Sequence, residues 1–242
     1  PTTPAVSRPY TGTFKGGSWN SQAFFCADVR KYHRKTKFVD RLMGKMDFLA
    51  LQETHSTEGR ALAHKSRTKT RIFWSHGTRS TNGVGLLVAH SFLANFTSAR
   101  WEEVETGRMA ILHLRGLKGS LDLMVVYLDA SAADERDLSL RRLAPRIAPQ
   151  VEALTVLFGD FNFVSLPCDR FNKNTGAWSG GNDHHNSLTF ARTLTTPNHL
   201  FELHQPEHTH EGGVSRSRLD RVFVNLFEAD NLDMHTECIA HP

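Results

Sequence analysis

The sequence has few cysteines and no long apolar segment. Its three cysteines, Cys26, Cys168 and Cys238, are far apart and include no CxxC pair, so we expect neither a disulfide framework nor a structural zinc site. No apolar run reaches membrane-spanning length, and the N-terminus lacks the pattern of a signal peptide. These absences favour an intracellular protein of a reducing compartment and argue against a membrane partner.

The chain also lacks repeats, low-complexity tracts and Gly/Ser-rich linkers. Its 242 residues are therefore expected to form one domain with a substantial core. Residues 1–10 are rich in Pro, Ser and Thr and are predicted to be disordered or the end of a linker, which leaves residues 11–242 as the domain. Because the chain starts without Met and ends in strand-like sequence, we expect a domain cut from a longer protein and truncated at its C-terminus.

Positive charge is present but modest, with a net charge of +4. Seven basic residues gather in one segment and are followed by three more: Arg30, Lys31, Arg34, Lys35, Lys37, Arg41 and Lys45, then Arg67, Lys69 and Arg71. Such a stretch can follow a phosphate backbone, or it can be the solvated face of a helix. The histidine pairs His184-His185 and His208-Thr209-His210 have no third ligand at a recognisable spacing, so we interpret them as surface histidines.

The apolar segments predict about nine strands and few helices. Strands are expected over residues 11–19, 47–53, 71–75, 84–89, 109–114, 121–127, 154–160, 219–225 and 234–240, and helices over 36–45, 134–147 and 188–194. Residues 165–186 are predicted to form a long polar loop. Several connections are too short for parallel crossovers. The predicted fold class is α/β of the α+β type: a four-layered sandwich of two packed, mixed, mostly antiparallel sheets with helices outside.

Five of these strands end on or near a polar group. The strand ends carry Asn20, Gln52-Glu53, Tyr127, Asp160 with Asn162, and Asp220-Arg221. Each has an ordinary structural explanation, such as a turn residue, a helix N-terminus, a packed aromatic or a local ion pair. Five together on the strands of one core favour a shared site. Carboxylates with neutral donors suit a Mg²⁺ ion and metal-assisted hydrolysis of a phosphoester.

Taken in order, these motifs resemble the endonuclease/exonuclease/phosphatase superfamily, and most of all the endonuclease domains of non-LTR retrotransposons. The matching pieces are Ser18-Trp19-Asn20, Leu51-Gln52-Glu53-Thr54, Gly83-Val84-Gly85, Val126-Tyr127, Gly159-Asp160-Phe161-Asn162 and Ser217-Arg218-Leu219-Asp220-Arg221. They cover most of the chain. The Leu-Gln-Glu-Thr and Gly-Asp-Phe-Asn pieces are moderate signals singly and strong ones together with the downstream motif.

The resemblance implies a role for each matching residue. Glu53 corresponds to the acidic metal ligand, and Asn20 to the asparagine that supports the metal site. Tyr127 corresponds to the tyrosine that contacts the scissile phosphate or the leaving group. Asp160 matches the aspartate that orients or activates water, with Asn162 as its phosphate-binding neighbour, and Asp220 matches an aspartate that binds metal or orients a final histidine. The implied cofactor is Mg²⁺, with Mn²⁺ as the alternative ion.

Three departures from the family pattern leave questions open. Asp28, which also follows an apolar run, competes with Asn20 for the first motif position, and we prefer Asn20 for its Ser-Trp-Asn context. The usual Pro-Asn after the tyrosine is Asp129-Ala130 here. The family's final Ser-Asp-His segment would fall just beyond Pro242.

The basic chain favours nucleic acid, and specifically double-stranded DNA, as the partner. We predict a nuclear endonuclease domain that nicks DNA so that a 3′-hydroxyl can prime reverse transcription. The side chains expected to contact nucleic acid are Arg34, Lys35, Lys37, Arg79, Asn82 and Arg218. The alternatives are a phosphomonoesterase acting on an inositol phosphate or a lipid head group, and a domain that binds nucleic acid without cutting it. No protein partner can be inferred.

Overall fold

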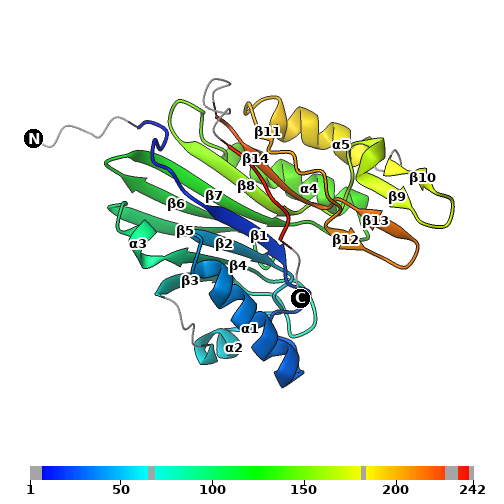
Figure 1. Cartoon of the computed structure of the whole chain (residues 1–242). Helices are drawn as coiled ribbons and strands as arrows, with labels where there is room; N and C mark the ends of the chain where they lie inside the picture. The colour runs from blue at the N-terminus through cyan, green and yellow to red at the C-terminus, as the bar shows by residue number, and fades with distance from the viewer. Residues whose placement is uncertain (1–6, 65–68, 181–183, 227–233, 240–242) are drawn as a thin grey trace, which may run out of the picture.

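Two β-sheets packed face to face form the centre of the protein (Figure 1). The structure is a computed structural model, and it describes residues 7–64, 69–180, 184–226 and 234–239. The first sheet has the order β1-β2-β4-β3, with β1 at Gly16–Asn20, β2 at Phe48–Gln52, β4 at Val84–Ala89 and β3 at Thr70–Ser75. Its β1 and β2 are parallel, and the other neighbours are antiparallel.

The second sheet is larger and has the order β11-β14-β8-β7-β6-β5. Its strands are β11 (Phe201–Glu202), β14 (Asp220–Val224), β8 (Leu154–Asp160), β7 (Gly119–Tyr127), β6 (Met109–Gly116) and β5 (Ser98–Glu105). Here β7 and β8 are parallel, and the remaining neighbours are antiparallel. The predicted mixed, mostly antiparallel pairing is confirmed.

The main core lies between the two sheets, because side chains alternate between the faces of each strand. On β2, Phe48 and Ala50 face the opposite sheet, where they join Phe158 of β8 in one apolar cluster. The intervening Leu49 and Leu51 face outward and pack in the cluster that also contains Phe38 and Leu42 of α1. The strand is therefore apolar on both faces, as a strand between two layers must be.

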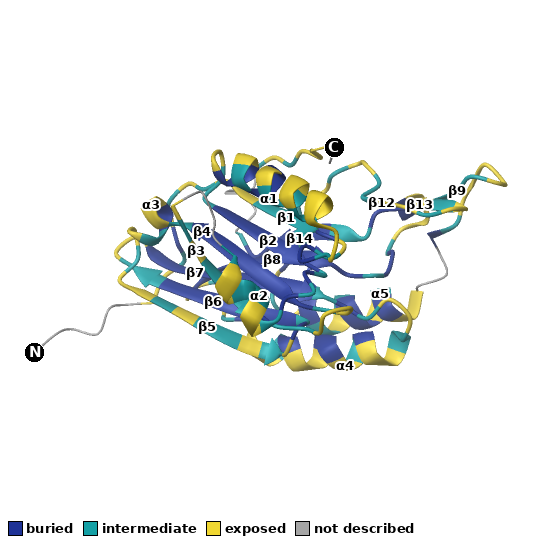
Figure 2. Ribbon diagram, turned by 90° about the horizontal axis from the view of Figure 1, so that it is seen from below, coloured by how far each residue is buried: buried dark blue, intermediate teal, exposed yellow. Residues whose placement is uncertain are grey.

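Helices cover the outer faces of both sheets, with their buried residues toward the strands and their exposed residues toward solvent (Figure 2). The first sheet is covered by α1 (Val29–Met43), and the six-stranded sheet by α4 (Ala133–Leu143) and α5 (His184–Phe190). A 3₁₀ turn at Ala144–Arg146 follows α4, a π-helical segment at Ala191–Thr195 follows α5, and α2 (Glu58–Ala63) and α3 (His90–Leu93) are short. The four-layered fold class is confirmed.

The helix α1 begins seven residues before the predicted start at residue 36. Asp28 causes this, because its Oδ1 accepts hydrogen bonds from the backbone N–H groups of Arg30 (2.8 Å) and Lys31 (3.0 Å). A carboxylate in this position satisfies donors that the first helical turn leaves free. The first turns of α1 are basic and exposed, so apolar periodicity alone does not reveal them.

A small four-stranded sheet projects from one end of the sandwich (Figure 1). It has the order β10-β9-β13-β12, with β9 at Arg170–Asn172, β10 at Ala177–Trp178, β12 at His210–Glu211 and β13 at Ser215–Ser217, and a 3₁₀ turn at Pro167–Asp169 precedes it. The predicted polar loop over residues 165–186 is therefore wrong in part. Strands of two or three residues are too short to show a hydrophobic period.

Three other element predictions need correction. The first strand begins at Gly16 instead of residue 11. The edge strand β5, with its many charged residues, was not predicted, although its Trp101 stacks on Phe73 at 5.6 Å between ring centroids. Residues 234–239 lie beside the chain that follows β11 without forming a strand; residue 240 lies outside the described residues.

The N-terminal segment belongs in part to the fold. Residues 1–6 of the predicted disordered end lie outside the described residues. Beyond them, Ser120 N–H donates to the Arg8 carbonyl at 2.8 Å, and Tyr10 N–H donates to the Ser120 carbonyl at 2.9 Å. Tyr10 is buried in the main core, so residues 8–10 are an integral part of the sandwich.

Gly159 is the position in β8 where no other residue fits. Its φ is +147°, and a Cβ added there would lie 1.9 Å from the carbonyl oxygen of Val126 on β7. We therefore expect Gly159→Ala to lower the free energy of unfolding by at least about 2 kcal/mol, measured by urea denaturation. Gly213→Ala is the control, because a Cβ at that site meets nothing within 4 Å. Equal losses in the two variants would contradict this reading.

Candidate active site

The strand pairing brings the predicted polar strand ends to one edge of the sandwich. In the first sheet, the parallel register places Asn20 beside Gln52, directly before Glu53. In the second sheet, the parallel register places Tyr127 beside Asp160, and the antiparallel strand β14 places Asp220 on the other side of Asp160. Residues far apart in the sequence are thus neighbours.

A hydrogen bond between the two sheets joins these groups. The Asn20 side-chain amide donates to Oδ2 of Asp160 at 2.7 Å, and the backbone N–H of Asn162 donates to Oδ1 at 2.9 Å. Both oxygens of a carboxylate that is only 4% exposed therefore have a donor. The alternative candidate Asp28 lies elsewhere, because it is exposed and caps α1.

The chain bends sharply after Asp160. Asn162 has a φ of +52°, in the left-handed region that asparagine tolerates better than most residues. Its side-chain amide donates to the carbonyl of Leu128 at 2.8 Å. Asn162 therefore does not continue the extended strand that ends at Asp160. The bend ties the loop after β8 to the loop after β7.

Glu53 stands beside this group on the first sheet. Its φ of +51° is strained for a residue with a Cβ. About 30% of its side chain is exposed, and its Oε1 lies 3.9 Å from Nε2 of His55. Its negative charge contributes to raising the pKa of both Asp160 and Tyr127, so the three groups share one electrostatic environment.

Burial and the closeness of several acidic groups disfavour the deprotonated forms of the site residues. Burial raises the pKa of Asp160, against the opposing hydrogen bonds from Asn20 and Asn162. Burial, together with the charges of Glu53 and Asp160, raises the pKa of Tyr127 to about 12, so its hydroxyl stays protonated. Carboxylates held close together favour a bound cation or proton.

The donor set fits a hard cation that keeps most of its water. Within the described residues, no three His, Cys, Asp or Glu side chains come together as a complete protein cage. Mg²⁺ does not need one, because it is commonly held by one or two carboxylates with waters and substrate oxygens. The partly exposed carboxylate of Glu53, supported by Asn20 and Asp160, supplies such a position.

Asp220 has an unsatisfied oxygen. Part of the residue reaches solvent, but its Oδ1 is buried and has no hydrogen-bond partner among the described residues. Its backbone N–H donates to Oγ1 of Thr209 at 3.0 Å. Burial, followed by the charge of Asp160, raises the pKa of Asp220 to about 7. The Oδ1 atom of this carboxyl group can therefore accept a hydrogen bond from a donor that is absent from the described residues.

Two charged residues beside the site, Arg108 and Asp129, are not among the predicted site residues. Arg108 lies in the turn between β5 and β6, donates to Asp129 at 2.7 Å and has its guanidinium 6.0 Å from the centre of the Tyr127 ring. Its Nη1 is buried without a partner among the described residues. Burial alone would raise the pKa of Asp129, but donors from Ala132 and Ser131 hold it at about 2. Asp129 thus fixes the loop where the family has Pro-Asn.

The predicted nucleic-acid contacts divide into two groups. Arg34, Lys37 and Arg79 are exposed, and Asn82 is half-buried in the loop whose backbone carbonyl accepts from His55 N–H at 2.9 Å. Two predictions are wrong, because Lys35 donates to three backbone carbonyls and Arg218 is 2% exposed. The Arg218 guanidinium pairs with Asp169 and Glu202, which leaves it unavailable to a phosphate.

Of the four histidines in the two pairs, three lie at the surface. His184, His185 and His210 are exposed, whereas His208 is half-buried against Trp178. The three cysteines are free. No helix of the described chain has both the length and the apolar character needed to cross a membrane.

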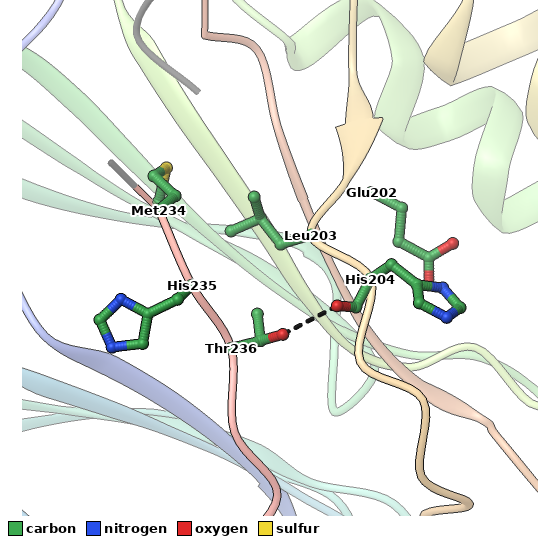
Figure 3. A pocket seen from close by; sticks show the side chains of 6 residues that line it. All are labelled: Glu202, Leu203, His204, Met234, His235 and Thr236. Carbon is green, nitrogen blue, oxygen red and sulfur yellow. Dashed lines mark hydrogen bonds between the residues drawn. The ribbon is translucent and has the colours of Figure 1, made fainter. Parts of the chain in front are cut away.

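A polar cleft lies beside the end of β11, outside the carboxylate group. It has a volume of about 220 Å³ and is lined by Glu202, Leu203, His204, Met234, His235 and Thr236. Figure 3 shows the side-chain hydroxyl of Thr236 reaching the His204 carbonyl, a hydrogen bond of 2.9 Å. The bond ties residues 234–239 to the chain after β11. Since none of Glu53, Asp160 and Asp220 lines it, this cleft is separate from the candidate site.

Comparison with known proteins gives one family and one fold. The sequence profile of the endonuclease/exonuclease/phosphatase family matches residues 17–233. No curated protein sequence matches the chain. Among solved structures, a crystal structure of humanized D. rerio TDP2 with 14 mutations is similar, with a TM-score of 0.58 and 17% sequence identity. The match covers 86% of this chain and 81% of that one, and at this identity it shows the shared fold.

The raised pKa of Asp220 predicts how its removal changes stability with pH. In the fold its pKa is about 7 against an ordinary value of 3.8, so ionisation destabilises the native state increasingly as pH rises between these values. Without divalent metal, Asp220→Asn is therefore expected to raise the free energy of unfolding at pH 8 by at least about 1 kcal/mol. The gain should disappear near pH 4. Urea denaturation at both pH values measures it, and a gain that is constant with pH would contradict the assignment.

Proposed function

The chain belongs to the endonuclease/exonuclease/phosphatase family, and from this premise we propose that it is a Mg²⁺-dependent endonuclease that nicks double-stranded DNA. Enzymes of the family are phosphoric ester hydrolases and generally use divalent metal ions such as Mg²⁺. The observation that carries the proposal is the 2.7 Å hydrogen bond by which Asn20 of one sheet holds Asp160 of the other. It joins the groups needed for phosphoester hydrolysis in one place.

Each residue has a task that its surroundings support. Glu53 and Asn20 would hold the ion, which neutralises charge on the phosphoryl oxygens and the leaving alkoxide. Asp160, fixed by two donors, orients the attacking water and accepts its proton. Tyr127 remains protonated because its pKa is about 12, so its hydroxyl donates to the phosphate.

Two further residues complete the proposed machinery. Asn162 donates one side-chain N–H to Leu128, and its second N–H is left to contact a phosphate oxygen. Asp220, with its unpartnered buried Oδ1, would orient a protonated donor such as an imidazole. A group so placed can stabilise charge on the phosphate or protonate the leaving oxygen.

Exposed basic side chains on two segments that adjoin the Glu53 loop support a polyanionic substrate. Arg34 and Lys37 project from α1, which follows directly on the loop beside Glu53, and neither takes part in a described ion pair. Arg79 is exposed in the loop whose end pairs with the backbone of residues 54 and 55. A duplex offers phosphates over a length that can reach both elements. A small phosphomonoester needs neither.

The finer assignment is to a non-LTR retrotransposon. It is supported by the order of the sequence motifs and by Ser-Arg-Leu-Asp-Arg following a His-Thr-His stretch. In that setting the nick would leave a 3′-hydroxyl from which reverse transcription starts, and the protein would act in the nucleus.

Nicking of supercoiled plasmid tests the proposed activity. With Mg²⁺ we expect conversion to the relaxed circle, which EDTA abolishes and fresh Mg²⁺ restores. Asp160→Asn should reduce the rate by at least about 100-fold, because it removes the base. Asp122→Asn is the control, since Asp122 is also a buried carboxylate, in the neighbouring strand β7, and is bonded to His113 and Arg115 outside the site.

The alternatives give different outcomes in the same assay. Release of inorganic phosphate from an inositol phosphate without nicking would replace DNA by a small phosphomonoester as the substrate. Salt-sensitive DNA binding without any nicking would mean that the domain only binds nucleic acid. Nicking by Asp160→Asn at the wild-type rate would remove Asp160 from its proposed role.

A further inference from the structure

We propose that Lys35 is a positioning residue: it fixes the loop of residues 21–23, which in turn holds the two predicted metal-site residues Asn20 and Glu53. Its Nζ donates to the backbone carbonyls of Ser21 (2.6 Å), Gln22 (2.5 Å) and Ala23 (2.9 Å). An ammonium group has three N–H donors and no acceptor, so this set of carbonyls uses its whole donor capacity. The proposal rests on the proposed function only in assigning a metal ion to the site.

The loop that Lys35 holds is strained. Gln22 and Ala23 are consecutive non-glycine residues with φ of +44° and +66°. Such conformations cost free energy and persist only where the surroundings impose them. In this curled conformation, three consecutive carbonyls converge on the ammonium group. The ammonium supplies the attraction that compensates for the curl, because it neutralises the repulsion between three oxygen dipoles.

The same loop fixes the backbone at both predicted metal-site residues. Ser21 N–H donates to the Gln52 carbonyl at 3.0 Å, and Ala23 N–H donates to the Glu53 carbonyl at 2.7 Å. On the other side, Gln22 N–H donates to the side-chain oxygen of Asn20 at 3.0 Å. Held in this way, the Asn20 amide oxygen accepts from the loop while its nitrogen donates to Asp160. Lys35 thus acts on Asn20 and Glu53 through the loop and contacts neither side chain in a described bond.

Lys35 differs in this respect from the basic residues around it on α1. Its neighbours Arg34 and Lys37 are exposed. Burial lowers the pKa of Lys35, although nearby Cys26 and Glu53 oppose the change. The side chain that the sequence assigned to a phosphate is instead bound, through its cationic ammonium group, to three backbone carbonyls of its own protein. Once the side chain is removed, we expect a free ammonium ion of similar size and donor pattern to bind in the same place.

Backbone hydrogen exchange in the full 242-residue chain tests the clamp without any substrate or metal. Lys35→Met removes the ammonium and keeps the length of the side chain. We expect faster exchange of the Ser21 and Ala23 amides, with the amides of β8 unchanged. Lys118→Met, an exposed lysine in the β6–β7 turn, removes the same charge and should leave the loop as it is. If Lys35→Met does not fold, Lys35→Gln, which keeps two N–H donors, replaces it.

Metal affinity provides the second readout. Residues that position metal ligands typically change affinity by 10- to 100-fold when removed, so Mn²⁺ binding followed by electron paramagnetic resonance should weaken about tenfold or more in Lys35→Met. Unchanged exchange and unchanged Mn²⁺ affinity, relative to Lys118→Met, would overturn the proposal. If the wild-type protein cleaves no phosphoester, the proposed function fails, whereas the exchange result still decides whether Lys35 holds the loop.

Chemical rescue distinguishes two explanations for the effect of removing Lys35: loss of the hydrogen bonds from its ammonium group, and loss of side-chain packing. In Lys35→Ala, n-propylammonium can enter the vacated channel and donate N–H bonds to the three carbonyls. It should slow the exchange of Ser21 and Ala23 and restore part of the Mn²⁺ affinity. Tetramethylammonium carries the same charge without N–H donors and should do neither. Equal effects of the two ions would contradict a hydrogen-bonded clamp.

Discussion

The buried carboxylate of Asp160 is the constraint on which the site depends. It is the last residue of β8, the central strand of the larger sheet, and it is 4% exposed. A carboxylate buried without donors is costly. Here Asn20 reaches across from the other sheet and Asn162 folds back from the following loop. The sandwich therefore has to close in one register, because sliding either sheet by a residue would leave the charge without its partner.

The backbone around the site is strained. Glu53, Asn162, Gln22 and Ala23 all have positive φ values without being glycine. Each lies in a loop that follows a strand of the site, and each loop is tied by hydrogen bonds to a neighbouring loop. Strained conformations of this kind persist where several contacts with the surrounding structure hold the residue in place. The strands make the site rigid. The positive φ values of the loop residues orient backbone and side-chain groups in ways that a regular strand does not allow.

The sequence predicts the parts of this site that depend on strands. Apolar runs such as that of β8 end abruptly on polar residues, and parallel pairing then carries Asn20 to Gln52 and Tyr127 to Asp160. Side-chain direction outside the strands could not be predicted. Lys35 and Arg218 look like phosphate contacts in a basic sequence, yet one faces carbonyls and the other is buried between Asp169 and Glu202. Only tertiary structure decides which charges are used internally.

Asp129 stands where the family has Pro-Asn, and its hydrogen bonds fix the loop after β7 in a different way. A proline fixes its own φ and needs no partner. Asp129 obtains a comparable rigidity from backbone donors at Ser131 and Ala132, which are 2.9 and 2.8 Å away. Its second oxygen then holds Arg108 against the Tyr127 ring. The pair of Asp129 and Arg108 thus fixes the loop after β7 and holds a guanidinium next to a tyrosine whose hydroxyl burial, with the charges of Glu53 and Asp160, keeps protonated.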